Sequence, residues 1–255
     1  MAQSQRIPPE HGSPLAKALS GAELVIFDFD GVIADSEVLS LGTLRDTLAD
    51  CGMPMSLARV RELFLGTSLA TITEHIALHG PNGAAEGFAE RWQNALFGQL
   101  RSDLTPVNAI LPFLEALQSL GVHHCIASSS NFERIGLSLT TMRLTEHFPH
   151  LFSAQQVKNG KPAPDLFLYA AQQMETAPDA CLVIEDSPHG VQAARAAGMR
   201  VFGFVDGGHL TDIRSAHAEV LLNAGAARVL NGFAELLAAP TYSGHSGRPE
   251  QQTGE

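Results

Sequence analysis

The chain has 255 residues, of which 45% are hydrophobic, and a formal net charge of −11 at pH 7. This length fits one large domain or two modest ones, and the hydrophobic share is enough for an ordinary buried core. The negative charge argues against nucleic acid or an anionic membrane as a partner, because it repels phosphate groups. No stretch of the sequence approaches the roughly 20 apolar residues that span a bilayer.

The two ends of the sequence differ in composition from its middle. Residues 1–20 have no apolar region of the signal-peptide type, and residues 239–255 are rich in Gly, Pro, Ser and Gln. We expect both ends to be disordered tails. The three cysteines are widely spaced, and Cys125 and Cys181 fall in apolar runs, where a free thiol behaves as a small hydrophobe. Reduced cysteines predict a cytoplasmic protein.

The first predicted strand, Leu24–Phe27, is followed at once by Asp28, Asp30 and Gly31. A continuous apolar run is typical of a strand buried on both faces of a parallel sheet. Ligands bind at the carboxyl ends of such strands. Two acids there can share a divalent cation, one carboxylate attacking while the other carries a proton. If this motif stood alone, the expected explanation would be a pair of solvated acids at the end of a strand.

After Gly31, helical periodicity replaces the strand pattern. Apolar residues recur at helical spacing, and turns containing Gly or Pro separate the helical segments. We expect residues 37–104 to form a separate α-helical cap domain, inserted into a core made of residues 21–36 and 105–238. The alternative is a set of extra helices packed on one face of a single domain. The helical segments are residues 38–51, 56–64, 69–79 and 84–100.

Alternation of strands and helices resumes near residue 104. The pattern predicts a Rossmann-like α/β fold, in which helices cover both faces of a doubly wound parallel sheet. Two apolar runs, residues 122–127 and 181–184, end in the polar clusters 128–131 and 185–187. Further strands are expected at Arg200–Phe204 and Arg228–Leu230, and helices at residues 111–120, 128–141, 164–174 and 188–197, with a last helix near the end.

Four polar clusters lie at predicted junctions between strands and helices, so a doubly wound fold brings them to one edge of the sheet. They contain the two aspartates, the hydroxyls of residues 128–130, Lys161 of the segment GKPAPD, and Glu185 with Asp186. Together they suit a phosphate group and a metal ion. Separately they have simpler explanations. The serines resemble an ordinary helix cap, and the acid pair resembles acids at a helix N-terminus, although Ser187 is the better capping residue.

These motifs resemble the haloacid dehalogenase-like hydrolase superfamily, in particular its phosphatase and β-phosphoglucomutase-like branch. The similarity covers roughly residues 24–237 and rests on DFDGVIADSE, ASSSN, GKPAPD and IEDSPHGVQAARAAGM. It implies an α/β core with a helical cap inserted after the first strand. It also implies a phosphatase that acts on a small phosphorylated metabolite, such as a sugar, sugar-acid or polyol phosphate, through an aspartyl-phosphate intermediate.

The resemblance gives each catalytic residue a role. Asp28 is the nucleophile, and Asp30 protonates the leaving oxygen and later takes a proton from the attacking water. An alternative for Asp30 is metal ligation alone. The hydroxyl of Ser128 and the amide of Ser129 bind the phosphate, and Lys161 ties the phosphate to the nucleophile.

The resemblance also implies Mg²⁺ as the cofactor. Mg²⁺ prefers oxygen ligands in an octahedron and keeps some of its waters. Asp28, the backbone carbonyl of Asp30 and Asp186 would supply oxygens, with Glu185 binding directly or through water. The eleven histidines show no spacing typical of a metal site, and we assign them no role. Lys158 is expected to be a solvated loop residue.

Substrate recognition is expected to come from the cap. Glu37 lies beside the first connection between core and cap, and the turn formed by Gly66, Thr67 and Ser68 is a candidate to face the core. The simpler explanation is that these three residues form only a turn.

Three other functions compete with the phosphatase. A dehalogenase of the same superfamily needs neither Asp30 nor the metal-type acids. Mutases of the β-phosphoglucomutase type carry a His shortly after DxDG and an Arg in the cap turn, where this chain has Ser40 and Leu69. A phospho-receiver module, which is not an enzyme, also clusters acids with Ser, Thr and Lys, but receivers are shorter and lack both the helical insert and the DxDG spacing.

Overall fold

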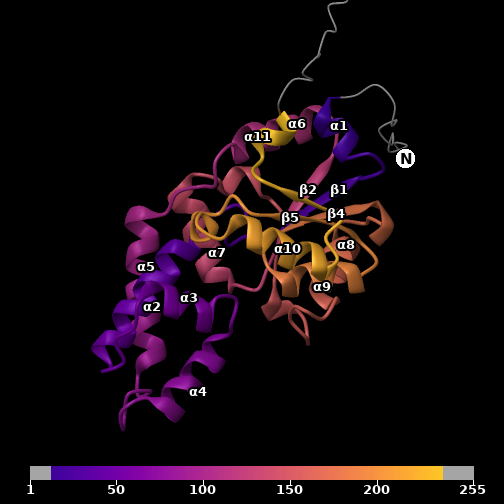
Figure 1. Cartoon of the computed structure of the whole chain (residues 1–255). Coiled ribbons are helices and arrows are strands. Elements are labelled where there is room, and N and C mark those ends of the chain that lie inside the picture. The colour runs from indigo at the N-terminus through magenta and orange to yellow at the C-terminus, as the bar shows by residue number, and fades with distance from the viewer. Residues whose placement is uncertain (1–12, 238–255) are drawn as a thin grey trace, which may run out of the picture.

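The computed structural model describes residues 13–237. At its centre is a six-stranded sheet with the strand order β3-β2-β1-β4-β5-β6, in which all neighbours are parallel (Figure 1). The first strand is central and the chain winds outward from it in both directions, which confirms the predicted doubly wound sheet. The strands are β1 (Leu24–Phe27), β2 (His123–Ser128), β3 (Leu151–Ser153), β4 (Cys181–Glu185), β5 (Arg200–Phe204) and β6 (Arg228–Leu230).

Both faces of the sheet are covered by helices. Val25 and Phe27 of β1 belong to one hydrophobic cluster, whereas Leu24 and Ile26 belong to another on the opposite face. Burial on both faces explains why this strand is a continuous apolar run. The first face is covered by α1 (Pro14–Ala18), α6 (Ile110–Ser119), α7 (Phe132–Met142) and α11 (Ala234–Leu237), and the second by α8 (Asp165–Gln173), α9 (Pro188–Ala196) and α10 (Arg214–Ala224).

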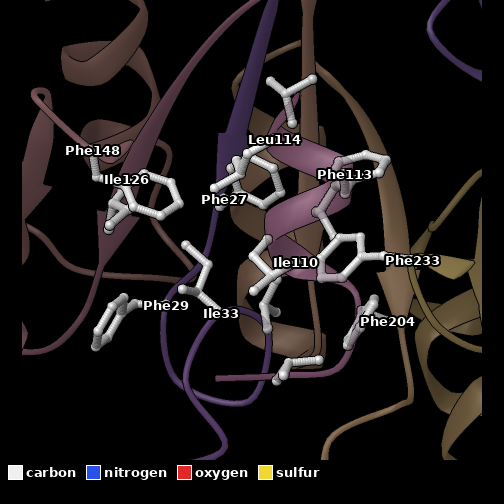
Figure 2. Close-up of a cluster of buried hydrophobic side chains, with 14 of the residues drawn as sticks. Phe27, Phe29, Ile33, Ile110, Phe113, Leu114, Ile126, Phe148, Phe204 and Phe233 are labelled. Atoms are coloured by element: carbon white, nitrogen blue, oxygen red, sulfur yellow. The ribbon is translucent and has the colours of Figure 1, made fainter. Parts of the chain in front are cut away.

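Aromatic rings fix the end of the central strand. Figure 2 shows Phe27 among the rings of Phe113, Phe148 and Phe233, and their centroids lie 6.0, 6.1 and 6.1 Å from that of Phe27. All are fully buried, and burying one such side chain stabilises a fold by roughly 1.5–3 kcal/mol. Because Phe27 directly precedes Asp28, this packing holds the backbone from which the aspartate projects.

The N-terminal segment corrects one prediction. Residues 13–20 were expected to belong to a disordered tail, but α1 forms there, and Leu15, Ala18 and Leu19 are buried in the first cluster. These three residues are spaced at i, i+3 and i+4, so they form one helical stripe that packs against the core. The rest of the predicted tails, residues 1–12 and 239–255, lies outside the described residues.

Residues 37–103, here called the helical insert, lie to one side of the sheet (Figure 1). The insert has a hydrophobic cluster of its own, which includes Leu44, Val60 and Phe88. The last helix starts four residues later than predicted, because Gly87 has a φ of 63° and serves as its N-cap residue. The helices of the insert are α2 (Glu37–Asp50), α3 (Leu57–Phe64), α4 (Leu69–His79) and α5 (Phe88–Asp103).

Polar and apolar contacts join the insert to the rest of the chain. Arg61 of α3 donates to both carboxylate oxygens of Asp212, at 2.5 and 2.8 Å, and to the backbone carbonyl of His209 at 3.1 Å. Trp92 of α5 packs against both the insert's cluster and the first core cluster, and its indole N–H donates to Thr43 at 3.2 Å. The side chain of Leu65 packs against the insert's cluster and the second core cluster.

The remaining elements are short. Strand β3 has only three residues and was not predicted. Single turns of 3-10 helix occur at Thr145–His147, Ala154–Gln156, Pro178–Ala180 and Gly208–Leu210. Among residues 13–237, no helix combines the length and apolar character needed to cross a membrane.

Candidate active site

The polar clusters meet at the carboxyl edge of the three central strands. Asp28 follows β1, Ser128 ends β2 and Glu185 ends β4, and the backbone N–H of Asp28 donates to Ile184 of β4 at 2.9 Å. Lys161 arrives from the loop before α8. In doubly wound sheets this edge, beside the strand where the chain order reverses, is where ligands bind.

Lys161 joins two of these acids. Its ammonium donates to Asp28 Oδ1 at 2.6 Å and to Glu185 Oε1 at 2.7 Å, and it lies 4.8 Å from the ring centroid of Phe167. Burial lowers the pKa of Lys161, but the two carboxylates outweigh burial and raise it above its ordinary value. Burial raises the pKa of Asp28 to about 7, against the opposing effect of Lys161. The lysine is therefore charged at neutral pH, and its charge lies against the carboxylate of Asp28.

Asp28, Glu185 and Asp186 form a compact group of carboxylates. One oxygen from each lies within 4.8 Å of the others, and all three residues are buried. Burial raises the pKa of Asp186 well above its ordinary value, with a further increase from Asp28, and it also raises the pKa of Glu185. Three acids facing the single charge of Lys161 leave a local excess of negative charge. This oxygen donor set fits a hard divalent cation such as Mg²⁺.

Two glycines make room for these acids. A Cβ at Gly31, whose φ is +80°, would lie 2.0 Å from Asp186 Oδ2, and a Cβ at Gly190 would lie 1.7 Å from Glu185 Oε1. No side chain fits at either distance. The glycines of DG and HG are therefore required because the backbone approaches the two carboxylates so closely.

Asp30 lies in a separate set of contacts. Its Oδ1 accepts hydrogen bonds from Ser36 Oγ at 2.5 Å and from Arg134 Nη2 at 2.7 Å, and its Oδ2 accepts one from Ser130 Oγ at 2.6 Å. Its carboxylate is not part of the group formed by Asp28, Glu185 and Asp186. The two aspartates of DxD therefore differ in their surroundings, although one residue separates them.

The serine segment forms the turn before α7. Ser128 is buried, and its Oγ accepts a hydrogen bond from the Ser130 N–H at 3.0 Å. Ser129 is exposed. Asn131 is the N-cap residue of α7 and accepts from the Arg134 N–H at 2.8 Å. The capping role thus belongs to Asn131, while Ser128 and Ser129 lie at the helix entry, a position suited to an anion.

The four residues named for substrate recognition occupy different surroundings. Glu37 begins α2 near the core, with Oε1 3.8 Å from Arg134 Nη2, and burial is the main cause that raises its pKa to about 7. Thr67 and Ser68 are exposed, and their hydrogen bonds are local: Thr67 donates to the Phe64 carbonyl, and Ser68 caps α4. Gly66 takes a φ of +72° in this turn.

Three residues that contact the acids of the site were not singled out from the sequence: Ser36, Arg134 and His209. Arg134 contacts Asp30, and the buried His209 places Nε2 3.3 Å from Asp186 Oδ2. Burial lowers the pKa of His209, which favours the neutral ring. The run Gly207, Gly208, His209 follows β5 and is one more polar cluster after a strand, a signal that was available in the sequence. Arg134 resembles any arginine in the first turn of a helix, so its pattern carries no signal.

Comparison with known proteins identifies the class to which this fold and site belong. A family model described as haloacid dehalogenase-like hydrolase matches residues 25–204. The chain belongs to this family, and as an enzyme it is a phosphoric monoester hydrolase, which its phosphatase relatives support. The resemblance deduced from the sequence motifs is thereby confirmed.

Individual relatives cover most of the chain. A 6-phosphogluconate phosphatase of Escherichia coli is 28% identical over 188 residues, which are 73% of this chain and 84% of that protein. A β-phosphoglucomutase of Bacillus subtilis is 30% identical over 193 residues, which are 72% of this chain and 83% of that protein. A crystal structure of a family hydrolase from Deinococcus radiodurans, with bound phosphate and sodium, is 33% identical with a TM-score of 0.70 and covers 85% of this chain and 93% of that chain.

Proposed function

We propose that the protein is a Mg²⁺-dependent phosphatase of a small phosphorylated metabolite, a sugar, sugar-acid or polyol phosphate, and that it works through an aspartyl-phosphate. The observation that carries this proposal is the contrast between the two aspartates. Asp28 is held by Lys161 beside Glu185, whereas Asp30 is held apart by hydroxyls and Arg134. Asp28 belongs to the buried group of acids around Lys161, and the carboxylate of Asp30 lies outside that group, so the two residues can take different parts, one in attack and the other in proton transfer.

In the first step, a carboxylate oxygen of Asp28 attacks phosphorus and the bond to the leaving oxygen breaks. Asp30 gives its proton to that oxygen, so the substrate leaves as an alcohol. The positive charge of Lys161 offsets the electrostatic repulsion between the phosphoryl oxygens and the carboxylate of Asp28. Ser128 and the Ser129 amide hold the phosphate at the entry to α7.

In the second step, water attacks the aspartyl-phosphate and Asp30 takes the proton of that water. Inorganic phosphate leaves and Asp28 is regenerated. Asp28, Glu185, Asp186 and the backbone carbonyl of Asp30 are the groups that would hold Mg²⁺. When bound, Mg²⁺ supplies positive charge that offsets the charge of the phosphoryl group. The buried carboxylates of Asp28, Glu185 and Asp186 repel one another, and a cation bound between them would offset this repulsion, which supports the assignment of the metal site.

The helical insert serves in this proposal as the cap domain, residues 37–104, on a core of residues 21–36 and 105–238. The insert's own hydrophobic cluster supports the division, although Leu96 and Leu100 of α5 are buried in the first core cluster. Covering the site excludes water during proton transfer. Glu37 and the turn Gly66, Thr67 and Ser68 would select the substrate, which comes from the cytoplasm if the three free cysteines mark a reducing compartment.

A mutase is the second candidate, and the β-phosphoglucomutase relative favours it. A mutase must bind a second phosphate while it transfers the first. Ser40 is buried in α2, and the exposed turn of residues 66–69 carries no cation, so this turn offers a distal phosphate no charge partner. These features support hydrolysis over transfer.

The test is a panel of sugar, sugar-acid and polyol phosphates incubated with the full chain and Mg²⁺, with released phosphate as the readout. We expect release that stops with EDTA and returns with added Mg²⁺. Full activity in EDTA would remove the metal from the proposal. No release from any member of the panel would refute the phosphatase.

A second assay separates hydrolysis from transfer. The protein is incubated with β-glucose 1-phosphate and catalytic glucose 1,6-bisphosphate, and both glucose 6-phosphate and free phosphate are followed. We expect no rapid formation of glucose 6-phosphate. Rapid formation with negligible phosphate release would establish the mutase instead.

A further inference from the structure

The carboxylate of Asp30 has one acceptor position left. An ionised carboxylate offers about four lone-pair positions, two on each oxygen. Oδ1 accepts from both Ser36 Oγ and Arg134 Nη2, and among residues 13–237 the one donor to Oδ2 is Ser130 Oγ. The position that remains lies on Oδ2. A proton carried by this residue therefore has one place to bind while these contacts hold.

Arg134 supplies the charged contact among these three. It projects from the first turn of α7, its side chain is 16% exposed, and the distance from Nη2 to Asp30 Oδ1 is 2.7 Å. Its Nε is buried and has no hydrogen-bond partner within residues 13–237, and the guanidinium forms ion pairs with Asp30 and, at 3.8 Å, with Glu37. Hydrogen bonds between charged groups are roughly twice as strong as neutral ones.

The three donors come from different parts of the chain. Ser36 lies between β1 and α2, at the entry to the insert, whereas Ser130 and Arg134 belong to the turn and helix that follow β2. Rotation of the Asp30 side chain would break contacts on both sides. The hydroxyls of Ser36 and Ser130 can rotate and donate to other acceptors, whereas the N–H groups of the planar guanidinium point in fixed directions. The orientation of the carboxylate thus depends most on the arginine.

We propose that Arg134 is the positioning residue for proton transfer by Asp30: by filling Oδ1 together with Ser36, it makes Oδ2 the oxygen that gives and takes the proton. The inference deepens the proposed function and rests on it, since Asp30 must act as acid and base there. A general acid works only within hydrogen-bond reach of the leaving oxygen, and misplacement by about 1 Å can lower a rate by about 100-fold.

The consequence depends on the leaving group. The alkoxide of a sugar or polyol leaves only when it receives a proton, whereas nitrophenolate is stable without one. Loss of Arg134 should therefore slow alkyl phosphates much more than 4-nitrophenyl phosphate. The comparison uses kcat/KM, which reports the steps up to and including the departure of the leaving group. The later attack of water on the aspartyl-phosphate therefore does not affect the measured ratio.

The experiment compares wild type with Arg134→Met on 4-nitrophenyl phosphate and on the sugar or polyol phosphate that the wild type cleaves fastest. We expect the alkyl-to-aryl ratio of kcat/KM to fall about 10- to 100-fold. Arg134→Lys should restore part of the ratio, because it keeps the charge without the planar fork. Arg143→Met, an exposed position at the end of the same helix, should leave the ratio unchanged.

A double variant completes the test. In an Asp30→Asn background the residue cannot carry the proton, so Arg134→Met should not change the ratio further. An equal decrease of kcat/KM on both substrates, or no decrease on either, would overturn the proposal, because a structural role of Arg134 would affect both substrates alike. If Arg134→Met does not fold, the ratio in Arg134→Lys decides, and an unchanged ratio there overturns the proposal. A wild type that releases no phosphate from either substrate refutes the proposed function itself, which is a different outcome.

Discussion

The carboxyl edge of the sheet and the turn of residues 66–69 are held by different kinds of contact. At the edge, charged side chains are buried and paired across long stretches of chain, as Lys161 is with Asp28. In the turn, Thr67 and Ser68 are exposed, and within the described part of the chain their side chains form hydrogen bonds only to residues three positions away. The edge is therefore fixed by the whole fold, whereas the turn is fixed by its own backbone. A substitution at the edge should affect the chemistry, and one in the turn should affect the choice of substrate.

The largest effect is expected at the nucleophile. Asp28→Asn should abolish turnover, because an amide oxygen cannot form the covalent intermediate. The fold should be retained, since Asn has nearly the same size, and circular dichroism checks this. Phosphate release at a rate close to that of wild type would refute the role of Asp28.

Removal of the buried cation should have the next largest effect. Lys161→Ala should lower kcat by about 10²- to 10³-fold, because the charge that opposes phosphoryl repulsion is lost. Steady-state kinetics on the best substrate measures this. A change in KM with kcat intact would mean that Lys161 only holds the substrate.

The turn should respond weakly and differently. Thr67→Ala and Leu69→Ala should alter KM more than kcat and change the ranking of substrates, with effects on kcat/KM of about 10-fold or less, as expected for uniform binding contacts. The same metabolite panel provides the readout. A loss of kcat as large as that of Lys161→Ala would remove the distinction between the two regions.

Glu37 begins α2 beside the carboxyl edge of the sheet, and its substitution should change the stability of the protein. Mainly because of burial, its pKa rises from the ordinary 4.5 to about 7. The native state therefore favours the protonated acid. The contribution of Glu37 to the free energy of unfolding is fully present below pH 4.5 and is lost as the pH rises through 7. Glutamine undergoes no such loss. The stability of Glu37→Gln relative to wild type should rise by on the order of 1–3 kcal/mol between pH 5 and pH 8.

Urea denaturation in EDTA, followed by circular dichroism at both pH values, measures this difference. EDTA keeps metal binding out of the comparison, and Asp28, Glu185 and Asp186 are common to both proteins, so their titration cancels. Equal stability differences at the two pH values would contradict the prediction.

The same distinction explains what the sequence could reveal. The strands Leu24–Phe27, Arg200–Phe204 and Arg228–Leu230 were predicted with their observed bounds. The first is a continuous apolar run because it is buried on both faces of the sheet, and Val201–Phe204 of the second is buried as well. Strand β3 and helix α1 were not predicted, and α1, with five residues, is too short to show a helical period. These elements depend on packing against distant parts of the chain.

The site divides in the same way. Asp28, Lys161, Glu185 and Asp186 were singled out together because each follows a strand or lies in a motif, and the structure brings them into one group. Arg134 was missed because its importance arises only where α7 meets the segment before α2. Contacts between elements of this kind leave no local pattern in the chain.

Trp92 is the single tryptophan of the chain, and it packs against both the insert's cluster and the first core cluster. Indole fluorescence is sensitive to the polarity around the ring. Because the chain has one tryptophan, its emission reports on the surroundings of Trp92. Separation of α5 from the core should shift that emission to the red, as water reaches the ring. The protein thus carries a built-in optical reporter of the insert's attachment, which needs no label and lies outside the group of Asp28, Lys161 and Glu185.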